Sequence, residues 1–502
     1  MTFALTIVAS YDPAYLRIVE SLVLADIAAG KRALVLDTSV ISPVPAESFH
    51  RPTLRFFGIA HPGHDLAQRM SALGAECLDV RDVLKDAPLL TLTPEQIDLL
   101  SIAVESALIT YYRTDKPNRS VRRVARVAKQ LAEEGQKVYS AIHYLLTTRD
   151  VGVVNVANGR FPAQKMAFVA AQVNGVATVH FEKGETPSAA YVQPYAPQNR
   201  LLSQNAVDTV LKGMSRKEVI DVAHEWLARR APSKSSSNEF SANWVNTLPE
   251  RLAPRPTDRQ VVGFFTSSQD EFLFLGPEWQ LHEWSSQFDA FDALLSHFEQ
   301  QGAVCYLRIH PNLATKAHDC FVRERADLQR LADKHPDLIV VSHDNPVSSY
   351  ALLDVSDAVV VWDSTIGLEA SARGIPVWTC AASRYGEVAD VREVFGPQQV
   401  TAQMLGRWKV NSFGAEKYIA YLVKRDRQME MSRPGWETWD VKRRPLAVSL
   451  AALLVSGGNP SIRDALGATI DVWRHRSREF NEASLRAKSR AKSPVKTAKP
   501  SS

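Results

Sequence analysis

Small hydroxyl residues follow an apolar run near residue 360 and lead into a helical pattern. The turn Ser364-Thr365-Ile366-Gly367 comes directly after the run 358–362, and the helical pattern begins near Leu368. A strand that passes into a helix in this way presents free backbone N–H groups and the positive end of the helix dipole to an anion. The turn therefore predicts a binding site for a phosphate or a diphosphate. The alternative is that Ser364 or Thr365 only caps the helix.

A histidine follows a second apolar run. His310 comes directly after the run 303–309 and is fixed by Pro311. Its imidazole can donate a hydrogen bond to a phosphate oxygen or a sugar carboxylate, although a histidine at a strand end can equally serve a structural hydrogen bond. In an open parallel sheet, ligands bind beyond the carboxyl ends of the strands, so we expect His310 and the turn at 364–367 on one edge. The residues after the run 261–265 belong to the same edge, and they are Thr266, Ser267 and Ser268.

The elements that must position these residues are apolar runs separated by helical patterns. In the second half of the chain the runs cover 261–265, 303–309, 338–341, 358–362 and 375–379. Strands that alternate with helices in this way predict a Rossmann-like parallel sheet.

The first half of the chain begins with the same rhythm. An apolar run at 3–9, a helical pattern that stops at Gly30 and a second run at 32–36 form a β-α-β unit, because parallel strands need a crossover helix between them. Further elements are predicted as helices over 95–112, 119–147 and 163–172 and as strands at 153–156 and 177–181. The predicted fold class is α/β, with two Rossmann-like domains facing a cleft.

A shift in composition separates the two halves. Pro and Ser replace the periodic apolar residues between 229 and 260, which indicates a linker. The predicted organisation is an N-terminal α/β domain with helical insertions at 1–228, a linker at 229–260, a C-terminal Rossmann-like domain at 261–413, C-terminal helices at 414–473 and a basic, mostly disordered tail at 474–502.

Composition excludes several classes of protein. The 502 residues are 45% hydrophobic and 23% charged, which excludes a fibrous or a wholly disordered chain. The longest apolar stretch, 446–456, is well short of the roughly 20 residues that span a bilayer. The apolar N-terminus has no basic region before it, so we interpret it as a strand and expect a cytoplasmic protein. The four cysteines have no C-x-x-C spacing, and we expect buried, reduced thiols.

Positive charge is concentrated in the tail. Of the net charge of +4, residues 474–502 contribute +7, so the rest of the chain carries −3. Such a segment either only keeps the protein soluble or is attracted to anionic lipid head groups. The basic helix at 116–129 is open to the same two interpretations, an anionic membrane surface or an ordinary solvated face. Aromatic residues do not interleave with these charges, so no nucleic-acid partner is predicted.

Charged residues of the N-terminal half supply candidates for the other side of a cleft. Asp12 lies in the first loop and Glu182 follows a predicted strand, and either carboxylate could deprotonate a hydroxyl as a catalytic base. A helix cap or a surface ion pair is the alternative for each. Arg160 is a candidate for clamping a substrate carboxylate or phosphate, or else a solvated loop arginine.

Several blocks of sequence resemble a known family. The blocks are Leu307-Arg308-Ile309-His310-Pro311-Asn312, then 348–353, 356–370 and 374–377. With their spacing, they are similar to bacterial capsular polysaccharide biosynthesis glycosyltransferases of the two-Rossmann GT-B architecture. The segments 264–268 with Asp270-Glu271, 158–160 and 180–184 are similar to further blocks of this family. The resemblance covers about 258–390 and, more thinly, 151–184.

The resemblance implies transfer of a sugar from a nucleotide donor, held by the C-terminal domain, to a glycan or lipid-linked acceptor, held by the N-terminal domain around Arg160. His310, Ser364 and Thr365 would hold the donor phosphate, with His310 also acting in catalysis, and Glu369 would hold ribose or sugar hydroxyls. Relatives with these motifs often use CMP-linked acidic sugars such as Kdo or sialic acid. Such enzymes generally need no metal, and no cofactor is expected. The full implied donor set is Thr266, Ser267, Ser268, Arg308, His310, Ser364, Thr365, Gly367 and Glu369.

One residue departs from the family pattern and leaves alternatives open. Asp363 directly precedes Ser364, where a carboxylate would repel a phosphate unless it points away or pairs with Arg308 or Arg373. It is similar to the Asp-Tyr-Ser-Ser turn of teichoic-acid glycerophosphotransferases, a polymerase class of the same fold. A non-catalytic, membrane-associated scaffold of glycan assembly and a nucleotide-sugar epimerase are the further alternatives. The expected location is cytoplasmic, peripheral at the inner face of the cell membrane.

Overall fold

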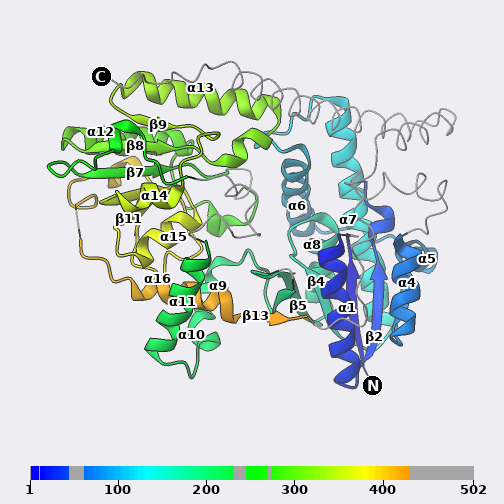
Figure 1. Ribbon diagram of the computed structural model, residues 1–502. Helices are drawn as coiled ribbons and strands as arrows, with labels where there is room; N and C mark the ends of the chain where they lie inside the picture. The colour runs from blue at the N-terminus through cyan, green and yellow to red at the C-terminus, as the bar shows by residue number, and fades with distance from the viewer. Residues whose placement is uncertain are drawn as a thin grey trace, which may run out of the picture.

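The computed structural model describes residues 2–10, 12–43, 62–186, 188–230, 245–268, 273–406 and 408–429. The predicted basic tail at 474–502, most of the C-terminal helices predicted at 414–473 and the pair Asp270-Glu271 lie outside the described residues. Figure 1 shows two lobes, one built around strands β1–β6 and the other around β7–β12.

The N-terminal sheet has seven strands in the order β13-β6-β5-β4-β1-β2-β3. Strands β1 to β5 run parallel to one another, whereas β6 is antiparallel to β5 and to β13. The strands are β1 (Phe3–Val8), β2 (Arg32–Asp37), β3 (Glu76–Asp79), β4 (Val151–Ala157), β5 (Ala177–Lys183), β6 (Ala189–Gln193) and β13 (Asp426–Gln428).

The C-terminal sheet has six strands, all parallel, in the order β12-β11-β10-β7-β8-β9. They are β7 (Val261–Phe265), β8 (Val304–Arg308), β9 (Ile339–Val341), β10 (Ala358–Val361), β11 (Val377–Thr379) and β12 (Arg392–Glu393). In chain order this is the doubly wound arrangement, whose strand order reverses between β7 and β10. A crevice therefore forms beyond the carboxyl ends of these two strands, the position at which such sheets bind ligands.

Helices cover both faces of the N-terminal sheet. On one face α6 (Pro94–Tyr112), α7 (Arg122–Thr148) and α8 (Pro162–Val173) pack against Leu5 and Ile7 of β1. On the other face α1 (Pro13–Ala28) and α4 (Pro62–Ala72) pack against Ala33 and Val35 of β2. The short α5 (Val80–Asp86) and the 3-10 turn η1 (Ser39–Ile41) complete this part. Alternate residues of each strand thus enter opposite cores.

The C-terminal sheet is covered in the same way. Val262 and Phe264 face α12 (Gln287–Gln300) and α13 (His318–Lys334), whereas Val261 and Phe265 face α14 (Ser349–Asp354) and α15 (Thr365–Ala372). Both sets are buried, which explains why these strands are continuous apolar runs in the sequence. Short 3-10 turns lie between the elements: η2 (Glu250–Leu252), η4 (Pro277–Trp279), η5 (Pro311–Thr315) and η6 (Pro397–Gln399).

Two segments connect the lobes. Helices α9 (Arg200–Asn205) and α10 (Val207–Val210) fall within the range 1–228 predicted for the N-terminal domain, and α11 (Arg216–Arg230) extends two residues beyond it. Nevertheless α10 and α11 share a core with α15 and α16 (Phe413–Lys424), because the apolar faces of α10 and α11 meet Leu368 and Tyr418. After α16 the chain crosses back, and β13 joins the edge of the N-terminal sheet (Figure 1).

The predicted fold class is confirmed by the two doubly wound sheets. The strands and helices predicted before residue 414 are present with shifts of a few residues at their ends. Of the range 414–473 predicted as helices, the described part contains α16, but residues 426–428 form the strand β13. The helix predicted at 119–147 begins at Arg122, and it buries Val124, Ala128 and Leu131 while Arg122 and Lys129 stay exposed. Among the described residues, no helix combines the length and the hydropathy that crossing a bilayer requires.

Candidate functional site

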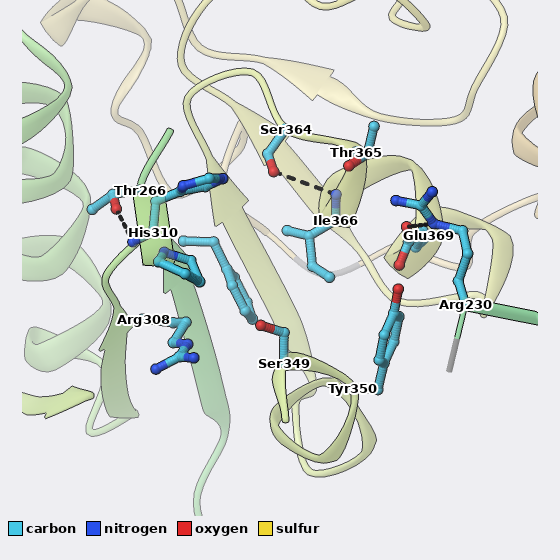
Figure 2. A pocket seen from close by; sticks show the side chains of 12 residues that line it. Arg230, Thr266, Arg308, His310, Ser349, Tyr350, Ser364, Thr365, Ile366 and Glu369 are labelled. Carbon is cyan, nitrogen blue, oxygen red and sulfur yellow. Dashed lines mark hydrogen bonds and ion pairs between the residues drawn. The ribbon is translucent and has the colours of Figure 1, made fainter. Parts of the chain in front are cut away.

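A pocket lies beyond the carboxyl ends of β7, β8 and β10, where the strand order reverses (Figure 2). It gathers cationic, hydroxyl and aromatic side chains around one carboxylate. Its lining residues are Arg230, Phe265, Thr266, Arg308, His310, Pro311, Ser349, Tyr350, Ser364, Thr365, Ile366 and Glu369. The structure thus brings together six of the residues predicted from the sequence, namely Thr266, Arg308, His310, Ser364, Thr365 and Glu369.

His310 is held beyond the carboxyl end of β8 by two hydrogen bonds. Its backbone N–H donates to Thr266 Oγ1 over 2.8 Å, and its ring Nδ1 accepts from the Asn312 backbone N–H over 3.1 Å, so that it caps η5. Because Nδ1 accepts, the proton of the neutral ring resides on Nε2. His310 therefore presents its ring as a hydrogen-bond donor through Nε2, in a pocket that also contains the N-terminus of α15.

Ser364 is the N-cap residue of α15, a position that suits both of its sequence interpretations. Its Oγ accepts from the Ile366 backbone N–H over 3.4 Å, and its carbonyl oxygen accepts from the Tyr385 hydroxyl over 2.7 Å. The cap is therefore real, and the cap residue also lines the pocket beside the exposed Thr365. The cap fixes the N-terminus of α15, and the positive end of the α15 dipole is directed at the pocket.

Arg308 contributes a buried positive charge. Its Nη1 donates to the carbonyl oxygens of Ser342 and Asn345 over 2.6 and 3.2 Å. Within the described residues, Nε and Nη2 have no hydrogen-bond partner. Burial lowers the pKa of Arg308 to about 10. An anion in the pocket would satisfy these donors and offset the cost of their desolvation.

Glu369 is the carboxylate of the pocket and is fully buried one turn into α15. Arg230 Nε donates to Glu369 Oε1 over 3.0 Å, and the Tyr350 hydroxyl faces the same carboxylate (Figure 2). Burial raises the pKa of Glu369, and Arg230 opposes this effect. A carboxylate held in this way can accept hydrogen bonds from sugar hydroxyls, since each oxygen has two lone pairs.

Three residues of the predicted donor set do not line the pocket. Ser267 Oγ donates to the Asp363 carbonyl oxygen over 2.7 Å, and Ser268 Oγ accepts from Asn312 Nδ2 over 3.1 Å. Both serines are buried and fix the loops around the pocket. Gly367 is buried in α15, and a Cβ there would lie 2.3 Å from Tyr385 Oη. Close packing against Tyr385 therefore favours a glycine at this position.

Asp363 is buried beside Ser364, and neither predicted arginine partner binds it. Arg308 bonds to backbone carbonyls, and Arg373 pairs with Asp354 over 2.7 Å. The Asp363 side chain is not among those that line the pocket.

The N-terminal candidates lie at the carboxyl edge of the other sheet. Asp12 caps α1 through the Ala14 backbone N–H, over 2.8 Å, and pairs with Lys183 Nζ over 2.7 Å. The oxygens of Glu182 accept from the Tyr15 hydroxyl and from Asn158 Nδ2. These two carboxylates are therefore neighbours at the carboxyl ends of β1 and β5, apart from the pocket lining.

Arg160 lies on the loop after β4, on the same sheet. Its Nε donates to Ser106 Oγ of α6, and its guanidinium lies 5.8 Å from the centre of the Phe161 ring. It does not line the pocket of the C-terminal sheet.

Sequence reasoning missed several lining residues. Ser349 and Tyr350 stand in the block 348–353 that carries the resemblance, so a signal for them was present. Arg230 had no such signal, because α11 precedes the C-terminal sheet in the chain and reaches the pocket only through packing. In the described part of the chain, no group of three or more His, Cys, Asp or Glu side chains is arranged to hold a metal ion.

Comparison with known proteins gives one family match. Residues 280–387 match the family model described as "Capsule polysaccharide biosynthesis protein". The predicted resemblance to this family is therefore confirmed over a segment that includes His310, Ser364, Thr365 and Glu369. Curated protein sequences give no match.

Solved structures show low similarity. The β-Kdo 2,4-transferase of KpsC from Thermosulfurimonas dismutans is 16% identical, with 54% of this chain and 79% of that chain covered and a TM-score of 0.37. The β-Kdo 2,7-transferase of the same protein is 14% identical, with 54% and 75% covered and a TM-score of 0.30. The UDP-GlcNAc 2-epimerase of Neisseria meningitidis, bound to UDP-GlcNAc, is 11% identical, with 84% and 99% covered and a TM-score of 0.28. At this level of similarity, the residues of the site have to support any assignment of activity.

Proposed function

We propose that this protein is a glycosyltransferase that moves a sugar from a nucleotide-activated donor to a glycan or lipid-linked acceptor in bacterial capsule or surface polysaccharide synthesis. One observation carries the proposal: His310 and the N-terminus of α15 line the same pocket at the switch point of a doubly wound sheet. Both features favour a phosphate, and this is where such sheets bind nucleotides. The match of residues 280–387 to a capsule biosynthesis family supports the same function.

The pocket residues suit a donor whose leaving group is a nucleotide phosphate. In the transfer step, the acceptor oxygen bonds to the anomeric carbon while the bond from that carbon to the donor phosphate oxygen breaks. Negative charge then develops on the leaving phosphate, and His310 Nε2–H and the N–H groups of α15 stabilise it. The proposed reaction therefore needs no metal, and excess EDTA should leave turnover largely unchanged. Complete, Mg²⁺-reversible loss of activity would contradict this step.

The proton of the acceptor hydroxyl must pass to a base, which we place on the N-terminal domain that is proposed to hold the acceptor. Asp12 and Glu182 are the candidates, and we favour Asp12. Both carboxylates already have hydrogen-bond partners within the chain, Asp12 in Ala14 and Lys183 and Glu182 in Tyr15 and Asn158. The preference rests on exposure, since the Asp12 side chain is 40% exposed on the loop after β1. Arg160 is proposed to hold an anionic group of the acceptor.

The donor is proposed to be a CMP-linked acidic sugar. Arg230, Arg308 and His310 place cationic and hydrogen-bond donor groups around the pocket, which suits the carboxylate and phosphate of such a donor. The alternative is a glycerophosphotransferase, for which CDP-glycerol would be the preferred ligand and a phosphodiester polymer the product. A non-catalytic scaffold would form no product with any donor.

Thermal unfolding with a panel of CMP, UDP, GDP and CDP compounds tests the proposal. A ligand at 100 times its dissociation constant adds about 2.7 kcal/mol to the stability of the folded state. We expect CMP and CMP-sugars to raise the melting temperature most, and a CMP-sugar to be consumed when a glycan acceptor is present. Stabilisation by none of these nucleotides would contradict the proposal.

The proposed membrane partner is an anionic surface at the inner face of the cell membrane. The basic tail at 474–502 and the exposed Arg122 and Lys129 of α7 support it by their charge. Removal of residues 484–502 should weaken binding to anionic vesicles at low salt and leave thermal stability unchanged. Equal vesicle binding by the full and the shortened chain would contradict a role of the tail in membrane binding.

A further inference from the structure

A charged residue from outside the C-terminal sheet reaches the donor pocket. Arg230 is the last residue of α11, which precedes the whole C-terminal sheet in the chain. Its Nε lies 3.0 Å from Oε1 of the fully buried Glu369, and both residues line the pocket (Figure 2). The pair therefore joins α11 to α15 inside the pocket.

The surroundings of Arg230 hold it in this position. Its guanidinium lies 4.4 Å from the centre of the Trp226 ring, one turn earlier on α11. Trp226 in turn donates from Nε1 to Glu185 Oε2 over 3.0 Å, and Glu185 lies between β5 and β6 of the N-terminal sheet. Arg230 is thus part of a chain of contacts that runs from the N-terminal sheet to Glu369.

We propose that Arg230 is a positioning residue of the donor pocket, which orients the Glu369 carboxylate to accept the paired hydroxyls of the donor's ribose. The inference rests on the proposed function, since it needs a nucleotide in the pocket. Arg230 and Tyr350 use only part of the accepting capacity of the carboxylate, so lone pairs remain for the two ribose hydroxyls. A neutral Glu369 would lose much of this strength, because hydrogen bonds to an ionised acceptor are roughly twice as strong.

The charges around Glu369 set the direction of the pH effect. Among the described residues, Arg230 from α11 and Arg373 from the end of α15 are cations that face it, and Tyr350 and Tyr385 are phenols beside it. Arg308 and His310 line the same pocket. Burial raises the pKa of Glu369, and Arg230 is the largest of the groups that oppose this rise. Removal of Arg230 should therefore raise this pKa further, so that ribose recognition weakens at a higher pH than in the wild-type protein.

The test compares the affinity of the full-length protein for CMP and 2′-deoxy-CMP between pH 5 and pH 8. The variants are Arg230→Met, Arg230→Lys and the control Arg229→Met, whose arginine is exposed and pairs with Glu225 outside the pocket. We expect the wild-type protein and the control to prefer CMP about tenfold, the size of one hydrogen bond to a charged group. Arg230→Met should lose most of this preference and show it only at the upper end of the pH range, and Arg230→Lys should retain part of it.

The outcomes separate the inference from the proposed function. If Arg230→Met lowers thermal stability but keeps the wild-type preference and pH profile, Arg230 has only a structural role and the inference is wrong. If neither CMP nor any other nucleotide binds the wild-type protein, the proposed function itself is wrong. If Arg229→Met abolishes the preference for CMP over 2′-deoxy-CMP as completely as Arg230→Met does, the inference is also wrong.

Discussion

The two sheets present charged side chains at the same topological position, yet they use them differently. At the carboxyl edge of the N-terminal sheet, Asp12 pairs with Lys183, and the two oxygens of Glu182 accept hydrogen bonds from Tyr15 and Asn158. At the carboxyl edge of the C-terminal sheet, a pocket opens among the polar groups, and two nitrogens of the buried Arg308 have no partner in the described structure.

This difference between the two edges indicates which polar groups are arranged to bind a ligand. Buried donors and acceptors in folded proteins are almost always satisfied, so the donors of the pocket-lining Arg308 that have no partner in the described residues favour an anionic ligand in this pocket. Residues whose hydrogen bonds are completed within the chain, such as Glu182, contribute to the fold first. The comparison therefore predicts different consequences for substitutions at the two edges.

The largest expected effect concerns the catalytic base at the N-terminal edge. Asp12→Asn should lower turnover at least about 100-fold, as loss of a general base does, while the asparagine still caps α1. Glu182→Gln should instead lower stability by about 1–3 kcal/mol. The glutamine amide keeps one acceptor oxygen, so its NH2 group would face one of the two donors, Tyr15 or Asn158, and leave that donor without an acceptor.

Steady-state kinetics and denaturant unfolding of the two variants measure these effects, with CMP affinity as the control. The reverse result, a large loss of turnover in Glu182→Gln with Asp12→Asn unaffected, would assign the base to Glu182.

The next effect concerns His310 and Ser364 at the C-terminal edge. His310→Asn can keep the turn, because an asparagine side chain also accepts from the N–H two residues on, but it loses the Nε2 donor. It should weaken donor binding and turnover by about 10- to 100-fold, the range of a hydrogen bond to a charged group. Ser364→Ala should cost less in binding.

A double-mutant cycle decides whether these two residues act on one phosphate. The double variant should lose less than the sum of the single losses. Ser364→Gly serves as the control, because glycine costs only a few tenths of a kcal/mol as a helix cap. Losses that add independently, or a His310→Asn protein with unchanged affinity and turnover, would show that the two residues are structural.

Much of this architecture could be predicted from the sequence, for a physical reason. Strands buried on both faces, such as 261–265 and 358–361, are continuous apolar runs, and the residues after them must meet at one edge. His310 and Ser364 were found in this way, whereas Glu369 was named only because of the family resemblance. The short edge strands β3 and β12 were not, since four half-buried residues or a two-residue pair leave no periodic pattern.

What could not be predicted depends on packing between distant segments. Arg230 reaches Glu369, 139 residues away, only because α11 packs against α16 and α15. Gly367 was assigned to the donor site as part of a motif, whereas the structure shows that it makes room for Tyr385. A sequence pattern identifies the turn but does not tell a residue that binds from one that lets its neighbours pack.

A smaller effect follows from that distinction. Gly367→Ala would place a Cβ 2.3 Å from Tyr385 Oη and 3.0 Å from Val361 Cγ2, and overpacking of this kind costs about 1–3 kcal/mol. Gly152→Ala in the N-terminal sheet is the matched control, because its nearest contact, with the Thr2 side chain, is 3.4 Å. Denaturant unfolding should show a loss for Gly367→Ala alone, and the loss should be smaller in a Tyr385→Phe background. Equal losses for the two glycines would contradict the packing role.

The smallest effect concerns charged groups outside the pocket that pair with one another, on α12 and at the end of α13 in the C-terminal lobe. Asp292 of α12 accepts from Lys334 Nζ over 2.7 Å and lies 2.8 Å from His335 Nε2. Burial opposes the shift, but these two partners together lower the pKa of Asp292 below its ordinary value. Because the folded-state pKa lies below the unfolded one, the carboxylate contributes stability above its unfolded pKa, and this contribution is lost as the pH falls through the folded pKa. Since the side chain of Lys334 is largely exposed, the contribution should stay below about 1 kcal/mol.

Asp292→Asn should therefore lower stability slightly at pH 7 and show a shallower loss of stability between pH 5 and pH 3 than the wild-type protein, as measured by urea unfolding. Parallel pH curves for the two proteins would show that this ion pair, unlike the groups of the pocket, has no energetic consequence.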